Sequence, residues 1–541
     1  MTIHLSIPLW LPAVGGVVAL LLPGRLARFA GLMGAALALG YAVTLIVDFD
    51  SSASGLQYVT DRSWISELGI HYKLGVDGLN LFLIGLTSLL FFFSTLWAAQ
   101  QQWERAGLFY FHMGMAHTAV LGALMAQDLA LFVAFFDLML IPFFFLTGQY
   151  GGPERVRAVT KLVIYTLVGS LLMLAAAIAT AVLAKQGSDG GQLTFVLTDL
   201  AKMPLPEGSQ KWIVGFFAAA FLVKMPAFPL HGWMPDGYRG MPLPVLAVFS
   251  GVLSKVAAYG FLRVVLPLFP EGAVFWQTPL LLVGLASVLY GSVMAFTTTE
   301  ARLILGYSSV AQLGFIVLGI FSLQDAGAQG AILQSFNHGL VVAPAFFIVG
   351  LLAARAGGSQ DIRDMGGIAF RAPVLAALFL IVALATLAMP GSANFTAEFL
   401  ILLGVFQSKI VIAIIAFTGV ALASVYMLRA FIRTMHNRQK EGAISRDIRL
   451  GDGLVLVPLV LLILAFALYP QLALDKSERG TKGSIEAAKA VAEPEAAAPA
   501  AATAAPTAPG GAAVPQQQVP VPPDAGAPQP VPVPQQQVPT P

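Results

Sequence analysis

Residues 216–236 read FFAAAFLVKMPAFPLHGWMPD, and this stretch decides the class of protein. An apolar helix runs up to Lys224, and three prolines follow within ten residues: Pro226, Pro229 and Pro235. Proline removes a backbone donor and clashes with the preceding turn, so the helix must unwind just past the lysine. Unwound backbone is tolerated within a membrane only where protein or a water-filled cavity satisfies it. The stretch therefore predicts a broken transmembrane helix beside a buried charge.

The composition of the whole chain agrees with a membrane protein. Its 541 residues are 57% hydrophobic and 11% charged, whereas soluble domains carry about 25% charged residues. The net charge of +2 gives no reason to expect a nucleic acid partner. Because the chain has no cysteine, disulfides, thiolate metal sites, Cys-ligated iron–sulfur clusters and a cysteine nucleophile are excluded.

Apolar blocks of about twenty residues, each long enough to cross about 30 Å of hydrocarbon, recur along the chain. They predict an all-α integral membrane protein with about 14 transmembrane helices. The first block, from about Leu5 to Leu22, has its basic residues after it rather than before it, so we interpret it as a retained span and not as a cleaved signal peptide. The predicted spans centre near residues 13, 38, 88, 117, 138, 171, 221, 254, 287, 313, 340, 382, 420 and 463.

The lysines and arginines of the predicted loops are divided unevenly between the two sides of the membrane, and the richer side is expected to face the cytoplasm. This predicts that both termini lie on the outer side of the membrane, in the bacterial periplasm or its equivalent. The outer side then receives Arg62, Lys73, Lys185, Lys202, Lys211, Arg263 and Lys409. The inner side receives Arg25, Arg28, Arg105, Arg155, Arg157, Arg239, Arg302, Arg355, Arg363, Arg371, Arg433, Arg438, Lys440, Arg446 and Arg449.

The composition changes near the C-terminus. The segment is rich in Ala and Pro, and the phrase VPQQQVP at 514–520 returns at 533–539. Such a segment cannot bury a core, and its composition favours extended, polyproline-like structure. We therefore predict a transmembrane domain over 1–473 and a disordered Ala/Pro/Gln-rich tail over 474–541, either inert or serving as a spacer or docking strip.

Four charged residues fall within predicted spans: Asp137, Lys224, Lys255 and Glu398. Each costs about 2.5–3.5 kcal/mol at membrane depth, so such residues usually pair or serve transport. A nearby Asp137 would hold Lys224 charged, and moving it away would let the lysine release its proton. The alternative is a set of static ion pairs that fix helix register. Lys255 and Glu398 have no partner nearby in sequence, which favours a proton relay.

Several polar residues accompany these charges. His338 lies in the eleventh predicted span and could either relay protons or make a hydrogen bond in a packed interior. Gln312 can hold a water but cannot carry charge. His231 and Asp236, which follow the first helix break, are candidates with Gln312 for holding water or giving access to the buried charges. Asp77, at the end of the third span, is interpreted as a cap or an interface contact.

A second helix break, at Pro390 and Gly391, lies just before Glu398. It falls five spans after the break at Pro226 and Pro229. Paired interrupted helices in corresponding halves indicate an inverted-repeat transporter, so we predict two inverted five-helix repeats, spans 4–8 and 9–13, with helices 7 and 12 broken. Proline kinks used only for packing would not explain why each break adjoins a charge.

These residues carry a resemblance to a known family. The chain, over roughly residues 1–473, resembles the antiporter-like subunit M of bacterial NADH–quinone oxidoreductase, respiratory complex I. The form Asn394-Phe-x-x-Glu398-Phe favours subunit M over its relatives, which usually have lysine at the second of these positions. The motifs that carry the resemblance are Gly75-Val-Asp77-Gly, Asp137 before Ile141-Pro142, 224–236, Gly251-Val-Leu-Ser-Lys255 and 390–399.

The resemblance implies a water-lined polar axis at mid-membrane. In that family the acid matching Asp137 pairs with Lys224, Lys255 is the central relay, and Glu398 ends the axis toward the outside, with His338 between them. Energy comes from quinone reduction in neighbouring subunits, so the resemblance implies other membrane subunits of complex I as partners. It implies flavin, iron–sulfur clusters and quinone in those partners and no cofactor or metal in this chain.

The sequence departs from the family pattern at two positions near the axis. Asp137 stands where the family usually has glutamate and is one methylene shorter, which could lengthen its pair with Lys224 or admit a bridging water. Gln312 stands where a second histidine is common. Farther from the axis, 237–242 lacks the family's usual His-x-Glu-Ala-Pro, and Glu300-Ala-Arg302 lacks a lysine often found before the arginine. The core relay residues are therefore retained, whereas the stretches that would connect them to the surfaces depart from the family pattern.

The hypothesis is a proton-translocating subunit of a respiratory NADH–quinone oxidoreductase, with Asp137, Lys224, Lys255, His338 and Glu398 as the relay. One alternative keeps transport and changes the ion or the complex: a subunit of an Mrp-type cation/proton antiporter or of a membrane hydrogenase. Another is a non-conducting structural scaffold. The scaffold predicts that neutralising the charges disturbs assembly and not pumping.

Overall fold

Helices make up nearly all of the computed structural model, which describes residues 4–53, 55–187, 192–438 and 446–493. Within these ranges, eleven helices are long and apolar enough to cross a membrane. The shorter helix α1 and two interrupted segments, α9–α10 and α17–α18, bring the crossing segments to fourteen, at the positions that the sequence predicts. The all-α membrane fold is therefore confirmed.

The first repeat holds spans 4–8 and the second holds spans 9–13. Spans 1–3 and 14 are α1 (Ser6–Leu21), α2 (Gly24–Asp48), α3 (Leu81–Ala99) and α20 (Leu450–Leu468). The first repeat is α4 (Ala106–Met125), α5 (Leu129–Leu138) with α6 (Leu140–Tyr150), α7 (Arg155–Gly187), α9 (Glu207–Lys224) with α10 (Met234–Gly240), and α11 (Leu243–Val248) through α12 (Ser254–Gly260) to α13 (Leu266–Leu268). The second is α14 (Pro270–Thr297), α15 (Ala301–Phe321), α16 (Asp325–Arg355), α17 (Pro373–Thr386) with α18 (Ala393–Ser408), and α19 (Ile410–Met435).

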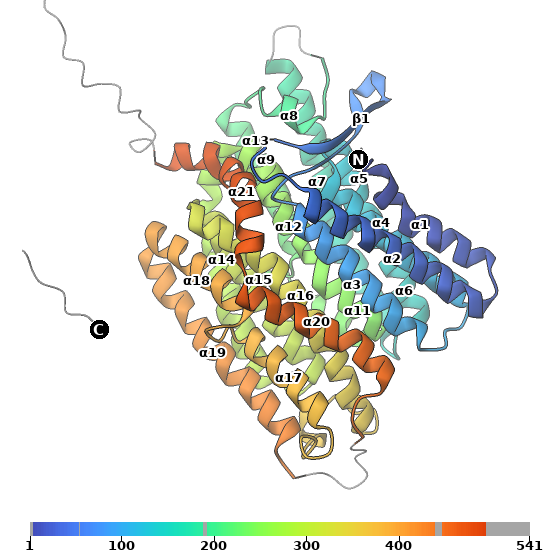
Figure 1. Ribbon diagram of the computed structural model, residues 1–541. Coiled ribbons are helices and arrows are strands. Elements are labelled where there is room, and N and C mark those ends of the chain that lie inside the picture. The colour runs from blue at the N-terminus through green and yellow to red at the C-terminus, as the bar shows by residue number, and fades with distance from the viewer. Residues whose placement is uncertain (1–3, 54, 188–191, 439–445, 494–541) are drawn as a thin grey trace, which may run out of the picture. The chain divides into compact units, whose positions relative to one another are not determined.

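The core lies where the two repeats meet. The apolar windows of α15 and of the segment from α11 to α13 are 100% buried and that of α16 is 94% buried, whereas α2 and α20 are 28% buried. Figure 1 shows α15 and α16 in the middle of the body, with α1 and α2 at one edge and α19 at another. Helices apolar all round belong in an interior, so the central helices are the ones able to hold buried charges.

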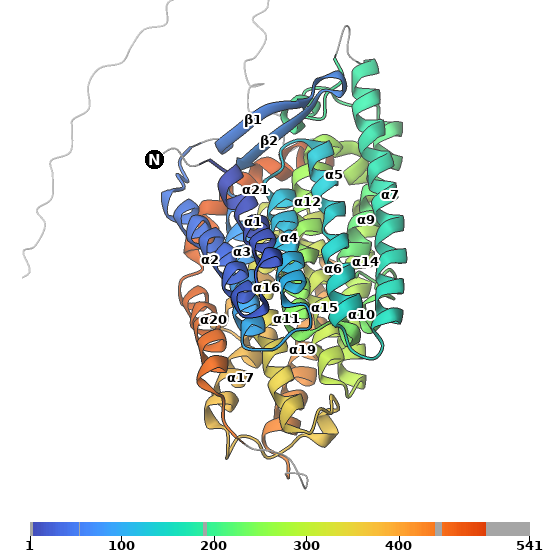
Figure 2. The ribbon, with the colours of Figure 1, turned by 90° about the vertical axis from the view of Figure 1, so that its right-hand side faces the viewer.

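One end of the helical body carries a β-hairpin that the sequence reasoning missed (Figure 2). Strand β1 (Gln57–Ile65) pairs antiparallel with β2 (Ile70–Val76). Tyr, Val, Thr, Trp and Ile in β1 favour extended structure, but the strand lies between long apolar blocks that dominate the pattern. We call this end, with the hairpin and Asp77, the hairpin face.

The opposite end of the body holds most of the arginines of the predicted inner loops. Arg239 makes a bidentate pair with Glu300, with nitrogen–oxygen distances of 2.6 and 2.7 Å, and Arg302 donates to the Met241 carbonyl at 3.0 Å. Arg355 lies at the C-terminal end of α16. We call this end, with Arg239, Arg302 and Arg355, the arginine face.

The predicted disordered tail begins with a helix instead. Helix α21 (Gln471–Ala492) buries small residues at helical spacing, including Ala473, Ser477 and Thr481, against the body. Lys476 Nζ donates to the carbonyl oxygens of Ile46 and Phe49, both at 2.9 Å. The prediction of disorder from residue 474 is therefore wrong up to Ala492, because composition does not show whether a small-residue face finds a partner. The predicted tail from residue 494 onward lies outside the described residues.

Candidate functional site

The first helix break positions Lys224 inside the bundle. Helix α9 ends at Lys224, the chain turns irregularly through the prolines, and helical structure resumes at α10. The lysine side chain is buried, and its Nζ lies 3.4 Å from the Phe136 carbonyl oxygen and 4.4 Å from the centre of the Phe136 ring. A cation over an aromatic face is stabilised by the ring quadrupole. The break thus leaves an ammonium group at membrane depth with an aromatic and a carbonyl as neighbours.

Asp137 is the second-last residue of α5, two residues before Met139, which separates α5 from α6. Its charge and that of Lys224 act on each other, Ser170 lies next to the carboxylate, and Asp137 Oδ1 has no hydrogen-bond partner among the described residues. Among the described residues, however, no direct ion pair joins Asp137 to Lys224. The close pair implied by the resemblance is therefore not present here, as expected for a side chain one methylene shorter than glutamate.

Lys255 lies on α12 between two π-helical turns, Phe249–Leu253 and Phe261–Val265. It is 1% exposed, and its Nζ donates to the Ser250 carbonyl at 2.7 Å. A π-turn disturbs the regular backbone ladder and frequently marks a functional site. The loosened turn supplies the carbonyl that the buried ammonium needs.

His338 lies on α16, is buried, and is close enough to Lys255 for the two charges to interact. Its Nδ1 has no hydrogen-bond partner among the described side chains and backbone. The adjacent Asn337 donates to the Ala393 carbonyl at 2.7 Å, which ties α16 to the start of α18. His338 therefore stands between the central lysine and the second helix break.

The second break positions Glu398. Helix α17 ends at Thr386 and α18 begins at Ala393, with Gly391 between them at φ +88°, a backbone angle that favours glycine. Glu398 is 2% exposed. The Gln334 amide donates to Glu398 Oε1 at 3.5 Å and to Gln312 Oε1 at 2.5 Å. The carboxylate therefore lies among neutral amides.

The helices that carry these residues form a continuous series. Helix α12 packs against both α9 and α16, and α16 packs against α18. Asn394 is fully buried, and neither polar atom of its side chain has a hydrogen-bond partner within the described ranges. Buried polar groups are usually hydrogen-bonded to protein or water, so Asn394 and His338 indicate a hydrated interior. Titratable groups in series along such an interior can exchange protons.

Two of the three predicted access residues, His231 and Asp236, lie toward the arginine face. The Asp236 carboxylate is buried and pairs with the Lys161 ammonium and, at 3.4 Å, with Arg157. His231 packs against aromatic rings, with its ring centre 4.7 Å from that of Tyr290. The third candidate, Gln312, lies beside Glu398 instead. The structure thus separates the access candidates into two groups at different depths.

Sequence reasoning overlooked the neutral polar residues of α16. Gln334 and Asn337 are both fully buried and bridge to α15 and α18. The signal that could have found them is a polar cluster, Gln334-Ser-Phe-Asn-His338, inside an apolar span. Polar side chains at membrane depth have to find partners.

Two interrupted helices around a series of buried charges define an antiporter-like membrane transporter. Residues 126–423, more than half of the chain, match the family model described as NADH:quinone oxidoreductase/Mrp antiporter, transmembrane. The chain belongs to this family, and within it to the group of NADH-quinone oxidoreductase subunit M proteins. The resemblance noted from the sequence motifs is thereby confirmed.

Similar proteins span most of the chain. Subunit M of Rhodobacter capsulatus is 33% identical, with 87% of this chain and 94% of that protein covered. Subunit M of Mycobacterium tuberculosis is also 33% identical, with 90% and 96% covered. Respiratory complex I from Thermus thermophilus contains a chain with a TM-score of 0.81 and 31% identity, covering 90% of this chain and 100% of that one. The Mrp complex from Dietzia, at 21% identity and a TM-score of 0.75, shares the fold.

Proposed function

We propose that this chain carries protons across a membrane as one subunit of a respiratory NADH–quinone oxidoreductase. The observation that supports this most strongly is the series of titratable groups at membrane depth, in which Lys224, Lys255, His338 and Glu398 are buried and Asp137 is half-buried. The helices that carry them contact one another in series. Membership of the subunit M family supports the same assignment.

In the proposed route, protons are taken up at the arginine face and loaded onto Lys224 or Lys255. Changing the distance between Asp137 and Lys224 changes the Coulomb energy that holds the proton on the lysine. The proton then passes through His338 and water held by buried amides to Glu398. Glu398 hands it to the opposite side.

The orientation and the site of redox chemistry are part of the proposal. An arginine-rich end is expected to face the cytoplasm, so we place the arginine face inside and the hairpin face, with both chain ends, on the periplasmic side of a bacterial inner membrane. Quinone reduction in partner subunits supplies the energy. We assign flavin, iron–sulfur clusters and quinone to those partners and no cofactor to this chain, which has no cysteine to ligate a cluster.

The test is the pair of variants Lys224→Ala and Glu398→Gln in the assembled complex, reconstituted into vesicles. The number of protons translocated per electron is expected to fall in both, with subunit content unchanged. Matched controls are Lys211→Ala and Glu207→Gln, which remove a partly exposed lysine–glutamate pair, 2.7 Å apart, at the start of α9. Full pumping by both buried-site variants would refute the proposal, and loss of assembly without any pumping defect would support a scaffold.

A further inference from the structure

A second polar stripe runs along the helix from Lys255 toward the hairpin face, although Lys255 Nζ itself bonds back to the Ser250 carbonyl at 2.7 Å. Lys255, Tyr259 and Arg263 are four residues apart, a spacing that places side chains on one helix face. Arg263 Nε donates to the Tyr259 hydroxyl at 3.0 Å, which confirms that the two share a face. Eight residues rise about 12 Å along a helix. That distance is most of the about 15 Å between the middle and the edge of the hydrocarbon layer.

The stripe ends on a buried ion pair at the hairpin face. The Arg263 guanidinium pairs with the Asp77 carboxylate, and the two side chains are only 15% and 12% exposed. The other Asp77 oxygen accepts from the Leu79 backbone at 3.0 Å, a turn contact ahead of α3, whose N-cap residue is Asn80. Asp77 is therefore an ion-pair partner and not the helix cap. Gln127 lies next to Tyr259 and donates to the Gly75 carbonyl at 3.4 Å. Tyr259, Arg263 and Asp77 therefore form one bonded group, with Gln127 beside it.

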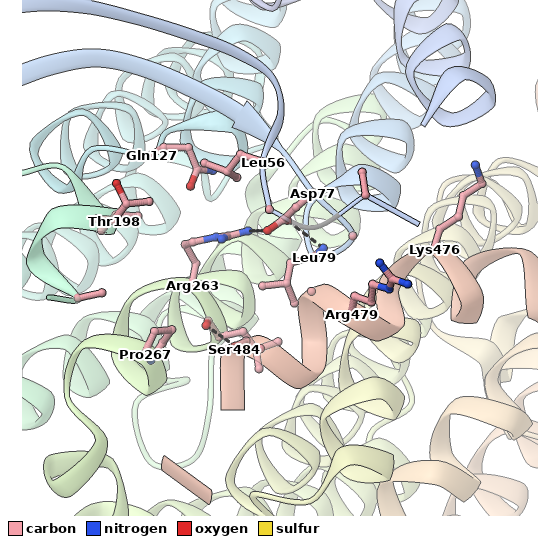
Figure 3. Close-up of a pocket in the computed structure, with 18 of the residues that line it drawn as sticks. Leu56, Asp77, Leu79, Gln127, Thr198, Arg263, Pro267, Lys476, Arg479 and Ser484 are labelled. Carbon is pink, nitrogen blue, oxygen red and sulfur yellow. Dashed lines mark hydrogen bonds and ion pairs between the residues drawn. The ribbon is translucent and has the colours of Figure 1, made fainter. Parts of the chain in front are cut away.

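This group opens into a cavity of about 490 Å³ (Figure 3). Asp77, Arg263 and Gln127 line it from the bundle side, and Lys476, Arg479 and Ser484 of α21 line it from the other. The cations of α21 are already engaged. Lys476 bonds the carbonyls at the end of α2, and Arg479 bonds the Ser52 carbonyl. These bonds of Lys476 and Arg479 hold α21 over the cavity. Arg263 is therefore the cation that lies between the cavity and Tyr259.

We propose that this stripe is a proton outlet of the first repeat, leading from Lys255 through Tyr259 to the cavity, with the Arg263–Asp77 ion pair as its gate. The inference rests on the proposed function, because it takes its protons from the relay at Lys255. It adds an outlet separate from the one at Glu398.

Each step in the outlet balances. In the proposed outlet the Lys255 ammonium leaves the Ser250 carbonyl and releases its proton to a water that bridges to Tyr259. The Tyr259 oxygen accepts a proton from this water while its hydroxyl gives up its own. The Asp77 carboxylate takes up that proton and passes it to water in the cavity. The gate is electrostatic. The Arg263 cation repels an approaching proton in a constriction, and its pairing with Asp77 keeps the acceptor occupied until the pair separates.

The mechanism gives the two gate residues opposite phenotypes. Arg263→Gln removes the electrostatic barrier and leaves Asp77 without its ion-pair partner. The passive proton conductance of the reconstituted complex is therefore expected to rise roughly tenfold, which corresponds to only a small part of the Coulomb barrier that one buried cation presents. Asp77→Asn keeps the cation and removes the acceptor, so proton translocation per electron falls without any leak. Tyr259→Phe, nearly identical in shape, is expected to give the Asp77→Asn phenotype. A purely structural ion pair would make both gate variants fail alike.

The hairpin supplies the matched control. Asp61 and Lys73 pair at 3.4 Å on the same face but away from the cavity, and Asp61→Asn and Lys73→Gln are expected to leave both leak and pumping unchanged. The inference is overturned if Arg263→Gln does not leak and Tyr259→Phe pumps fully in assembled complex. If those results accompany a loss of pumping in Glu398→Gln, the relay stands and only the outlet fails.

A second measurement does not depend on turnover. Because the chain has no cysteine, single cysteines report water access. A thiol reagent added on the hairpin side is expected to label Thr198→Cys, which lines the cavity. It is expected to label Tyr259→Cys only when Arg263→Gln is also present. Equal protection of Tyr259→Cys with and without the gate would contradict the outlet.

Discussion

The two broken helices place their charges on opposite sides of the break. Lys224 is the last residue of α9, before the break, whereas Glu398 lies in the second turn of α18, after the break. The C-terminal end of a helix carries a partial negative charge and the N-terminal end a partial positive charge. The end of α9 therefore stabilises the Lys224 cation, and the start of α18 stabilises the Glu398 anion. The stabilisation is stronger for Lys224, because the dipole effect falls off beyond one turn and Glu398 lies in the second. The breaks supply oriented dipoles as well as unwound backbone.

The surroundings of the two charges also differ. Lys224 has an acid whose charge acts on it and an aromatic ring beneath it, whereas Glu398 has the neutral amides of Gln312 and Gln334. Coulomb coupling extends over several ångströms, but a hydrogen bond needs close geometry. The first repeat is thus suited to sensing charge, and the second to holding a proton in a fixed place.

Reversing the charge at the first break should have the largest effect. Lys224→Glu puts an acid at a helix C-terminus beside Asp137, with both the dipole and the neighbour repelling it. We expect the amount of assembled complex, measured on native gels, to fall by about tenfold or more, since an uncompensated buried charge costs about 3–5 kcal/mol. Lys211→Glu at the start of the same helix is the control. Normal assembly of Lys224→Glu would show that the break does not select the sign of its charge.

Removing the bridging amide at the second break should have the next largest effect. Gln334→Leu leaves Gln312 and Glu398 without their shared donor, and an unmet buried polar group costs about 1–3 kcal/mol. We expect proton translocation per electron to fall several-fold, while Gln334→Asn retains part of it. If the leucine variant pumps normally, Glu398 does not depend on amide geometry and the contrast between the two repeats is lost.

The aromatic beneath Lys224 should matter less. Phe136→Leu removes a cation–π contact of about 1–2 kcal/mol, so pumping measured in vesicles is expected to fall about two- to threefold. Phe132→Leu is a matched control, because Phe132 lies one turn earlier on α5 and packs against Phe221, whereas the cation–π contact of Lys224 is made with Phe136. Equal effects of the two substitutions would assign the loss to packing.

The smallest effect is expected far from both breaks, in the loop before α17. Hydrogen bonds from Arg363 lower the pKa of Asp361 to about 2. Because the pKa of Asp361 in the folded protein lies below its ordinary value, the ion pair stabilises the fold fully at pH values above the ordinary pKa. This stabilisation is lost as the pH falls through about 2. Asp361→Asn should therefore speed thermal inactivation slightly at pH 6. The loss of stabilisation free energy should be less than about 1 kcal/mol, because the pair is largely exposed. The difference from the unsubstituted complex should shrink below pH 3, and a constant difference would contradict the assignment.

Much of the fold followed from the sequence because single features dominate it. Apolar length fixed the crossing segments, and the prolines after Lys224 and before Glu398 fixed both breaks. Weaker signals were hidden. The hairpin lies between long apolar blocks that dominate the pattern. Helix α21 contains too few apolar residues to be distinguished from the Pro- and Ala-rich tail that follows it.

The candidate site divided in the same way. Asp137, Lys224, Lys255 and Glu398 were visible because a charge inside an apolar span has few structural explanations. Gln334 and Tyr259 were not, since a neutral polar or aromatic residue in a helix is common and its role depends on what faces it.

The sequence by itself determined that this chain crosses a membrane many times, where two of its helices break, and which titratable groups lie at membrane depth. Those facts follow from composition and local stereochemistry, which act along the chain. Only the tertiary structure decided that Asp137 and Lys224 make no direct pair, that amides surround Glu398, and that Lys255, Tyr259 and Arg263 lead to a cavity under α21. These depend on distances between helices far apart in sequence, which packing sets.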